Sequence, residues 1–328
     1  VKQTGASRFP GNGEFRGENR PYGVLMTISL NVQGLPHPDE EVERQREEAE
    51  RKTVAPEEEE PEEENDREAK EPEVTIEISD STGAVIRTFE EPATLGVNRI
   101  IWDLRRDGFK RPQVGEERSD ERPSGPEVLP GAYGVRISYG DHEAGGSVRV
   151  LADPRFEIPE GDRQRKYAAV MHAGAIQEVV SEMIERIHHA RSEIDEVLER
   201  ARDGGEESES GSDAEGESVE LVRMGRELKK TFGALEERLW VPPDTKGIVG
   251  RENALSKIGY AQGALDSSWG APTSAQETYL RQAENAVEEL LAEFNRVFGE
   301  DVEQFRARVA AAGIEFLRPK EALRMPER

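Results

Sequence analysis

The sequence predicts a multi-domain β + α protein in which an antiparallel β-sandwich precedes an antiparallel helical bundle. In the first half, short runs carry apolar residues at every second position between turn residues, which is typical of strands with one buried face. After Asp153 the apolar residues recur about every 3.6 positions, which is the period of amphipathic helices. A chain of 328 residues is long enough to bury two cores. We therefore place the sandwich at 24–153 and the bundle at 160–317.

About six short strands, separated by turn residues, are expected in the sandwich. They are the runs 24–30, 74–78, 85–89, 98–105, 133–138 and 147–151. The turn residues Asp80–Gly83 lie between two of these runs, so that 74–89 should form a hairpin. Between Asp107 and Pro126 the chain is polar and proline-rich, which predicts a long exposed loop.

Trp102 is the expected centre of the sandwich core. On an extended strand, Ile100 and Trp102 point to the same side and Ile101 points to the other. The indole is the largest apolar side chain in this region, and burial of an aromatic ring of this size dominates the energetics of a core.

Four amphipathic helices and a short fifth helix are expected in the bundle. Their apolar stripes cover 162–202, 221–239, 254–265, 274–298 and 302–309. Ser274 and Glu277 have the spacing of a capping box, which predicts the start of the fourth helix. Gly299 is expected to end that helix, because glycine is common just past a helix C-terminus.

Two acidic tracts carry most of the formal net charge of −25. The tract 39–73 has 18 acidic and 6 basic residues, and the tract 203–220 has 8 acidic residues and no basic one, so that together they carry −20. Both contain few large apolar side chains and cannot offset the entropy of ordering, so we expect disordered segments, with some helical potential in 40–52. Nucleic-acid binding is disfavoured, because no basic stripe occurs elsewhere.

The chain has no cysteine, which excludes disulfides and thiolate metal sites. Its apolar runs fall far short of the roughly 20 residues that a membrane-spanning helix needs. Residues 1–23 are expected to be a loop that trails from a missing upstream domain, so that the chain would be an N-terminally truncated fragment. Residues 318–328 are expected to be a tail.

No residue is predicted to be catalytic, to bind a cofactor or to ligate a metal. His188 and His189 are adjacent and face different sides of a helix, and His172 lies several turns away, so we interpret all three as helix-surface histidines. Glu185 and His188 form one Glu-x-x-His match, but a di-metal carboxylate site needs a second copy, which the sequence lacks.

Two other groups of residues invite a functional interpretation. Asp103 and Arg105 could be a catalytic pair, but polar residues at the rim of a strand whose tryptophan is buried explain them better. The glycines between 11 and 23 do not lie between a strand and a helix, so they predict no phosphate-binding loop. Whether the chain belongs to an enzyme stays open.

Several motifs follow one another in an order that is typical of a known family. They are Phe15–Gly23, Val74–Asp80 with Gly83 and 85–87 behind it, Gly96–Arg105, Leu129–Tyr133 and Asp153–Arg155. From Phe9 to Leu317 the chain resembles the C-terminal region of bacterial sortilin-like BNR-repeat β-propeller proteins, which are often labelled glycosyl-hydrolase-like. Its β part is similar to the Ig-like domain of flagellar hook-cap proteins.

The resemblance implies an Ig-like sandwich beside a β-propeller in an exported protein, extracellular or periplasmic. The propeller repeats, of Ser-x-Asp-x-Gly-x-x-Trp type, are absent from this chain, so no activity of the propeller can be assigned to a residue here. We expect a non-catalytic accessory region that braces the propeller, its intramolecular partner, or presents it to another protein. Two alternatives stay open: a contribution to the active cleft of an exported glycosyl-hydrolase-like enzyme, and a self-association or adhesion module.

Overall fold

The computed structural model describes residues 21–53, 72–112, 124–206, 212–242, 252–312 and 323–326. The chain divides into two compact units. The β unit comprises the described residues up to Gly108 and those from 124 to 156, and the helical unit comprises 109–112 and the described residues from 157 onward. The protein is therefore a mixed β + α protein with antiparallel sheets, as predicted.

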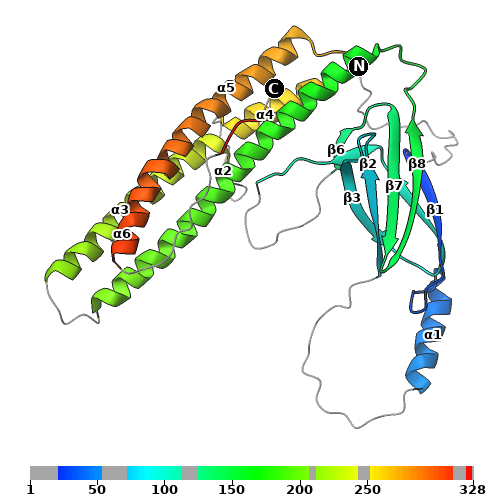
Figure 1. Cartoon of the computed structure of the whole chain (residues 1–328), viewed down its shortest axis with the longest axis horizontal. Coiled ribbons are helices and arrows are strands. Elements are labelled where there is room, and N and C mark those ends of the chain that lie inside the picture. The colour runs from blue at the N-terminus through cyan, green and yellow to red at the C-terminus, as the bar shows by residue number, and fades with distance from the viewer. Residues whose placement is uncertain are drawn as a thin grey trace, which may run out of the picture. The chain divides into compact units, whose positions relative to one another are not determined.

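Eight strands form the described part of the β unit (Figure 1). They are β1 (Val24–Leu30), β2 (Glu73–Ser79), β3 (Val85–Pro92), β4 (Gly96–Trp102), β5 (Arg105–Asp107), β6 (Ser124–Glu127), β7 (Gly131–Tyr139) and β8 (His142–Val150). A four-stranded sheet has the order β3-β2-β7-β8, while β1 pairs with β4 and β5 with β6, all antiparallel. The predicted hairpin is confirmed, because β2 and β3 pair with Ile76 opposite Phe89.

Trp102 belongs to the core of the β unit, as predicted, and is only 1% exposed. The ring of Tyr133 meets it edge-on at a centroid distance of 5.4 Å, and the indole Nε1 donates a hydrogen bond of 2.7 Å to the carbonyl of Arg105. The β1–β4 pair and the four-stranded sheet contribute to one core, which contains Leu35, Val74, Ile76, Ile78, Ile86, Ala93, Ile100, Trp102, Tyr133 and Ile137.

The first acidic tract begins with a helix, which corrects the expectation of disorder for its first part. Helix α1 spans Glu40–Thr53. Asp39 caps it, because its Oδ1 accepts from the backbone N–H of Glu41 at 3.0 Å. Arg46 ties the helix to the β unit by donating to the carbonyl of Leu35 at 3.0 Å. Residues 54–71 of the predicted disordered segment lie outside the described residues.

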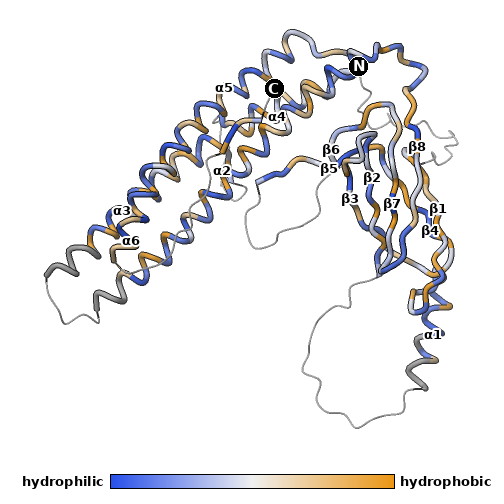
Figure 2. The backbone as a smooth tube through the Cα atoms, viewed as in Figure 1, coloured by the Kyte–Doolittle hydropathy of each residue, from blue (hydrophilic) through white to orange (hydrophobic). Residues whose placement is uncertain are grey.

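The helical unit contains α2 (Glu160–Glu206), α3 (Ser212–Leu239), α4 (Ala254–Asp266), α5 (Ser274–Arg296), the π-helical turn η1 (Val297–Asp301) and α6 (Val302–Ala311). Helix α2 packs against α3, α4 and α5, and the buried residues of these helices form one core. Apolar and polar stretches alternate along the helices in Figure 2, as amphipathic helices require. Residues 188, 195 and 198 of α2 meet residues 236, 229 and 225 of α3, so these two helices run antiparallel.

Two predicted boundaries in the helical unit are wrong. Helices α2 and α3 extend into the tract 203–220, which was expected to be disordered, and leave outside the described residues only 207–211. The reason is cooperativity, because a helix that is already nucleated by core packing extends at little cost beyond its last buried residues. The capping box is also one residue earlier than predicted: Thr273 is the N-cap and Gln276 its partner.

Gly299 does not end the fourth helix. At Val297 the helix changes into η1, which contains Gly299, and then continues as α6. Phe294, Val297 and Phe305 are all completely buried, so the apolar stripe runs through the change. The wider π turn shifts the register of the stripe without breaking the chain's helical course. No helix in the described part of the chain is long and apolar enough to cross a membrane.

Candidate functional site

A polar cluster forms around a segment that the sequence predicted to be part of an exposed loop. Residues 109–112, which follow β5, belong to the helical unit, and Phe109 packs against Gly174 in α2. Asp107 of β5 and residues 124–126 of β6 also fall within the predicted loop Asp107–Pro126, whose residues 113–123 lie outside the described part. The loop prediction is wrong for Asp107 and 124–126, which lie in strands, whereas 108–112 contain no helix or strand, as predicted. The packing of 109–112 in the helical unit was not predicted, because the sequence carries no signal for a partner distant along the chain.

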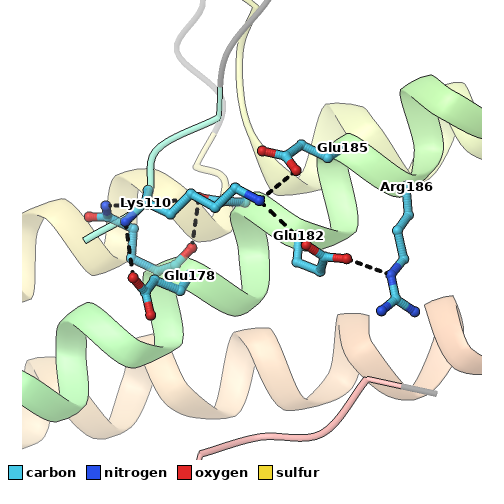
Figure 3. A network of polar contacts seen from close by, with 7 residues as sticks. Lys110, Glu178, Glu182, Glu185 and Arg186 are labelled. Atoms are coloured by element: carbon cyan, nitrogen blue, oxygen red, sulfur yellow. Dashed lines mark hydrogen bonds and ion pairs between the residues drawn. The ribbon is translucent and has the colours of Figure 1, made fainter. Parts of the chain in front are cut away.

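The backbone of Lys110 is bound by three side chains of α2 (Figure 3). Its N–H donates to Oε1 of Glu178 at 3.1 Å. Its carbonyl accepts from Nε2 of Gln177 at 2.9 Å and from Oγ of Ser181 at 3.0 Å. Gln177 is 7% exposed and Ser181 is fully buried, so these contacts hold the segment with polar groups that lie inside the helical unit.

Gln177 also connects this cluster to a second helix. Its Oε1 accepts a hydrogen bond of 3.1 Å from Nε2 of Gln262 in α4. The amide of Gln177 thus donates to one segment and accepts from another, which fixes its orientation. A buried amide that is satisfied on both sides stabilises one arrangement of the elements around it.

The side chain of Lys110 continues the cluster as an ion-pair network (Figure 3). Its Nζ lies 2.6 Å from Oε2 of Glu185 and 3.5 Å from Oε2 of Glu182. The other oxygen of Glu182 accepts from Nε of Arg186 at 2.8 Å. Acidic and basic groups therefore alternate along the network, from Glu185 through Lys110 and Glu182 to Arg186.

This network shifts two pKa values away from the range that acid–base catalysis needs. Partial burial pulls the pKa of Lys110 down, but Glu185 and Glu182 outweigh it and hold it above its ordinary value of 10.5. Burial pushes the pKa of Glu182 up, but Arg186 and Lys110 prevail and hold it below its ordinary value of 4.5. Because a catalytic lysine needs a depressed pKa and a catalytic acid a raised one, the cluster is suited to holding the segment in place.

A second polar cluster lies between α2 and α3. The carboxylate of Glu236, which is 8% exposed, accepts from His188 Nε2 at 2.6 Å and from Trp240 Nε1 at 3.3 Å, and pairs with Arg191. These contacts join residues 45 and 48 positions apart in the chain. They satisfy a carboxylate that would be costly to bury alone.

The interpretation of the histidines as surface residues is confirmed for one of the three. The side chain of His189 is 55% exposed and pairs with Glu193 one helical turn away. The interpretation is wrong for His172, whose side chain is 17% exposed and whose Nε2 lies 3.1 Å from Glu284 Oε1. The side chain of His188 is 33% exposed and reaches the surface, but its Nε2 also contacts Glu236 of α3. Each of these two faces a neighbouring helix, and the sequence cannot show this because the partner carboxylates are 48 and 112 positions away.

Asp103 and Arg105 take structural roles at the end of β4. Asp103 accepts from the backbone of Arg105 at 3.1 Å and from Ser124 Oγ at 2.7 Å. Arg105 donates to the carbonyl of Gly125 at 2.9 Å. The two residues hold β6 against β5, as expected for polar residues at the rim of a strand. Leu104 between them has a φ of 60°, the one positive value at a described residue other than glycine.

The buried polar side chains of the described residues all have partners. They are Asn98, Gln177, Ser181, Glu236, Asn253, Gln276 and Glu284. Their partners are backbone N–H groups at helix starts, backbone carbonyls, or side chains of neighbouring helices. Within the described ranges, one buried side-chain nitrogen lacks a partner, Nε of Arg87, whose Nη1 lies 3.4 Å from Asp107.

No group of three or more described histidine, aspartate or glutamate residues is arranged to hold a metal ion. Comparisons with family models, curated proteins and solved structures find no match to the chain.

Proposed function

We propose that this chain is a non-catalytic accessory region of an exported sortilin-like β-propeller protein, in which it braces or presents the propeller. The observation that carries the proposal is the use of the buried polar groups. Active sites leave some polar side chains aimed at a pocket and shift their pKa values toward the working pH. Here Gln177, Glu236 and Glu284 instead form hydrogen bonds with other residues of the fold.

In this proposal the β unit is an Ig-like sandwich. Its support is the single core to which the β1–β4 pair and the four-stranded sheet both contribute, since two packed sheets that share a core are the basis of a sandwich. The helical unit would be a bundle, and the support is one continuous core drawn from all its helices together with the antiparallel course of α2 and α3.

The course of the chain also supports a structural role. Between β5 and β6 the chain leaves the β unit, contributes residues 109–112 to the helical unit, and returns. It then passes to the helical unit again after Phe156. A region whose two units share interleaved segments of chain is suited to act as one support for a neighbouring domain.

The partner and the location are proposed from the family resemblance. The main partner would be the propeller of the same protein, and the location extracellular or periplasmic. The strongly acidic composition, with a net charge of −25, supports the proposal that nucleic acid is not a partner.

Two measurements test the proposal. The purified chain is assayed for turnover on a panel of glycoside and ester substrates, beside the variants Glu236→Gln and Glu284→Gln. We expect no turnover; activity that one of these substitutions abolishes would overturn the non-catalytic assignment.

In the intact protein, deletion of residues 1–328 should lower the melting temperature of the propeller. If the deletion abolishes turnover by the intact protein while the propeller stays fully folded, a contribution to an active cleft is favoured instead.

A further inference from the structure

The outer edge of β8 differs from the opposite edge of the same sheet. At the opposite edge, Asp107 accepts from the backbone N–H of Thr88 in β3 at 3.4 Å, and β3 ends in Pro92. Both features protect an edge strand from pairing with another chain. Along β8, by contrast, β7 is the one described element that pairs, and residues 142–147 are all exposed.

β8 is also unusually regular for a free edge strand. It has nine residues, pairs with β7 from Gly131↔Val150 to Tyr139↔His142 without a bulge, and contains no proline or lysine. Natural edge strands are usually shortened, bulged or blocked by such residues, because a long regular edge is a template for another strand. The edge of β8 is therefore built for pairing.

The hairpin turn shows which backbone groups face outward. Tyr139 and His142 close a two-residue loop, and the closing pair of such a loop is hydrogen-bonded. The even-numbered residues of β8 therefore bond to β7, and the odd-numbered ones direct their N–H and C=O groups to the free edge. The outward groups belong to Glu143, Gly145, Ser147 and Arg149.

We infer that β8 pairs antiparallel with β8 of a second copy of this chain, about a two-fold axis at Gly146. In the register that uses all nine residues, His142 faces Val150 of the other copy and Gly146 faces itself. The same register places Glu143 opposite Arg149 of the second copy, twice by symmetry. No other antiparallel register of this strand with itself brings these opposite charges face to face.

The neighbouring charges are compatible with this pairing. Arg136 on β7 lies 3.9 Å from Glu143, but it is engaged by Glu77 through a 2.5 Å hydrogen bond. Glu143 therefore stays available, with a side chain that is 60% exposed. Opposite charges directly across an antiparallel pair stabilise it, and the two-fold symmetry doubles the effect. The pairing does not depend on the proposed accessory role.

The first test measures self-association of the full chain by sedimentation velocity from about 1 µM to about 1 mM. We expect a monomer–dimer equilibrium. Arg149→Glu should weaken the dimer about tenfold, because it sets like charges face to face. The charge swap Glu143→Arg with Arg149→Glu should restore it. A monomer at every concentration, or a dimer that Arg149→Glu leaves as stable as the unchanged protein, would overturn the inference. Thermal melting checks that each variant keeps the fold.

The second test uses the absence of native cysteine. A cysteine at Gly146 lies opposite its own copy, in a non-hydrogen-bonded pair with Cα atoms about 4.5 Å apart, which is within the range of disulfides. A side chain there meets no atom within 4 Å, so the substitution is tolerated. Under mild oxidation Gly146→Cys should form a covalent dimer. His142→Cys, also exposed but at the far end of the strand, is the control, and equal cross-linking of both variants would contradict the register.

Discussion

The ring of Phe109 occupies the space that a side chain at position 174 of α2 would need. A Cβ atom built on Gly174 would lie 2.0 Å from Cε2 of Phe109, well inside van der Waals contact. The glycine thus allows a segment between two strands to pack directly on a helix backbone. This contact explains why a glycine occupies position 174, although glycine in the interior of a helix lowers the stability of the helix.

Gly174→Ala should lower the free energy of unfolding of the helical unit by about 1–3 kcal/mol, because the new methyl group displaces Phe109. The matched control is Gly263→Ala in α4, where a Cβ would meet no atom within 4 Å. That change should raise the stability by about 0.5–1 kcal/mol, because alanine favours helix. Urea unfolding followed by circular dichroism measures both.

A double-mutant cycle shows whether Phe109 is the cause. In a Phe109→Ala background the space above Gly174 is open, so Gly174→Ala should cost little or even stabilise. Equal effects of Gly174→Ala with and without Phe109 would mean that the ring does not pack where the structure places it.

The contrast between Phe109 and Trp102 shows what the sequence can predict. Trp102 lies in a strand whose residues alternate between buried and exposed, so its side of the strand follows from a local period of two. Phe109 stands alone in a polar, proline-rich stretch, and its partner Gly174 is 65 positions away. The one available signal was an aromatic residue in a stretch predicted to be exposed.

Trp102→Ala should lower the free energy of unfolding of the β unit by about 3–5 kcal/mol, since it opens a large cavity in a small core. It also leaves the carbonyl of Arg105 without its 2.7 Å hydrogen bond. Ile101→Ala is the control on the same strand, because Ile101 is 38% exposed and should cost far less. Chemical denaturation of both variants compares them, and a nearly unchanged midpoint for Trp102→Ala would show that the indole is not in the core.

Glu236→Ala should lower the free energy of unfolding by about 1.5–3 kcal/mol, because hydrogen bonds from His188, Arg191 and Trp240 converge on one buried carboxylate. Asp195→Asn is the control, since Asp195 also joins α2 to α3, at 2.5 Å from Lys229 Nζ, but its side chain is 59% exposed. An exposed pair contributes less than about 1 kcal/mol. Guanidinium unfolding should separate the two, and equal losses would contradict the difference in burial.

The polar clusters could not be predicted for the same reason as the contact of Phe109. Glu182, Glu185 and Arg186 lie within one helix, so their spacing was visible as ordinary charge pairing along α2. Lys110, which turns these side chains into one network, comes from another part of the chain, and a single sequence carries no signal for that pairing. The pairing of His188 with Glu236 likewise joins residues far apart in the chain and has no signal in the sequence. The strands and helices could be predicted because their periods are local.

The stability of the helical unit should depend on pH through Glu182 and Lys110. The pKa of Glu182 is depressed in the folded state, so its contribution is complete above its ordinary value of 4.5 and is lost as the pH falls through the folded value. The pKa of Lys110 is raised, so its contribution is complete below 10.5 and is lost as the pH rises through its higher folded value.

Glu182→Gln should therefore destabilise the helical unit at pH 7 and have a diminishing effect as the pH falls below 4.5. The side chain of Glu182 is 35% exposed, so solvent screening keeps the effect at or below about 1 kcal/mol. Glu196→Gln, at an exposed position about four turns further along α2, is the control. Denaturant unfolding of the two variants and the unchanged protein between pH 3 and pH 7 measures the difference. If the difference in free energy of unfolding between the Glu182 variant and the unchanged protein stays constant over this range, the charge of the carboxylate does not hold Lys110 in place.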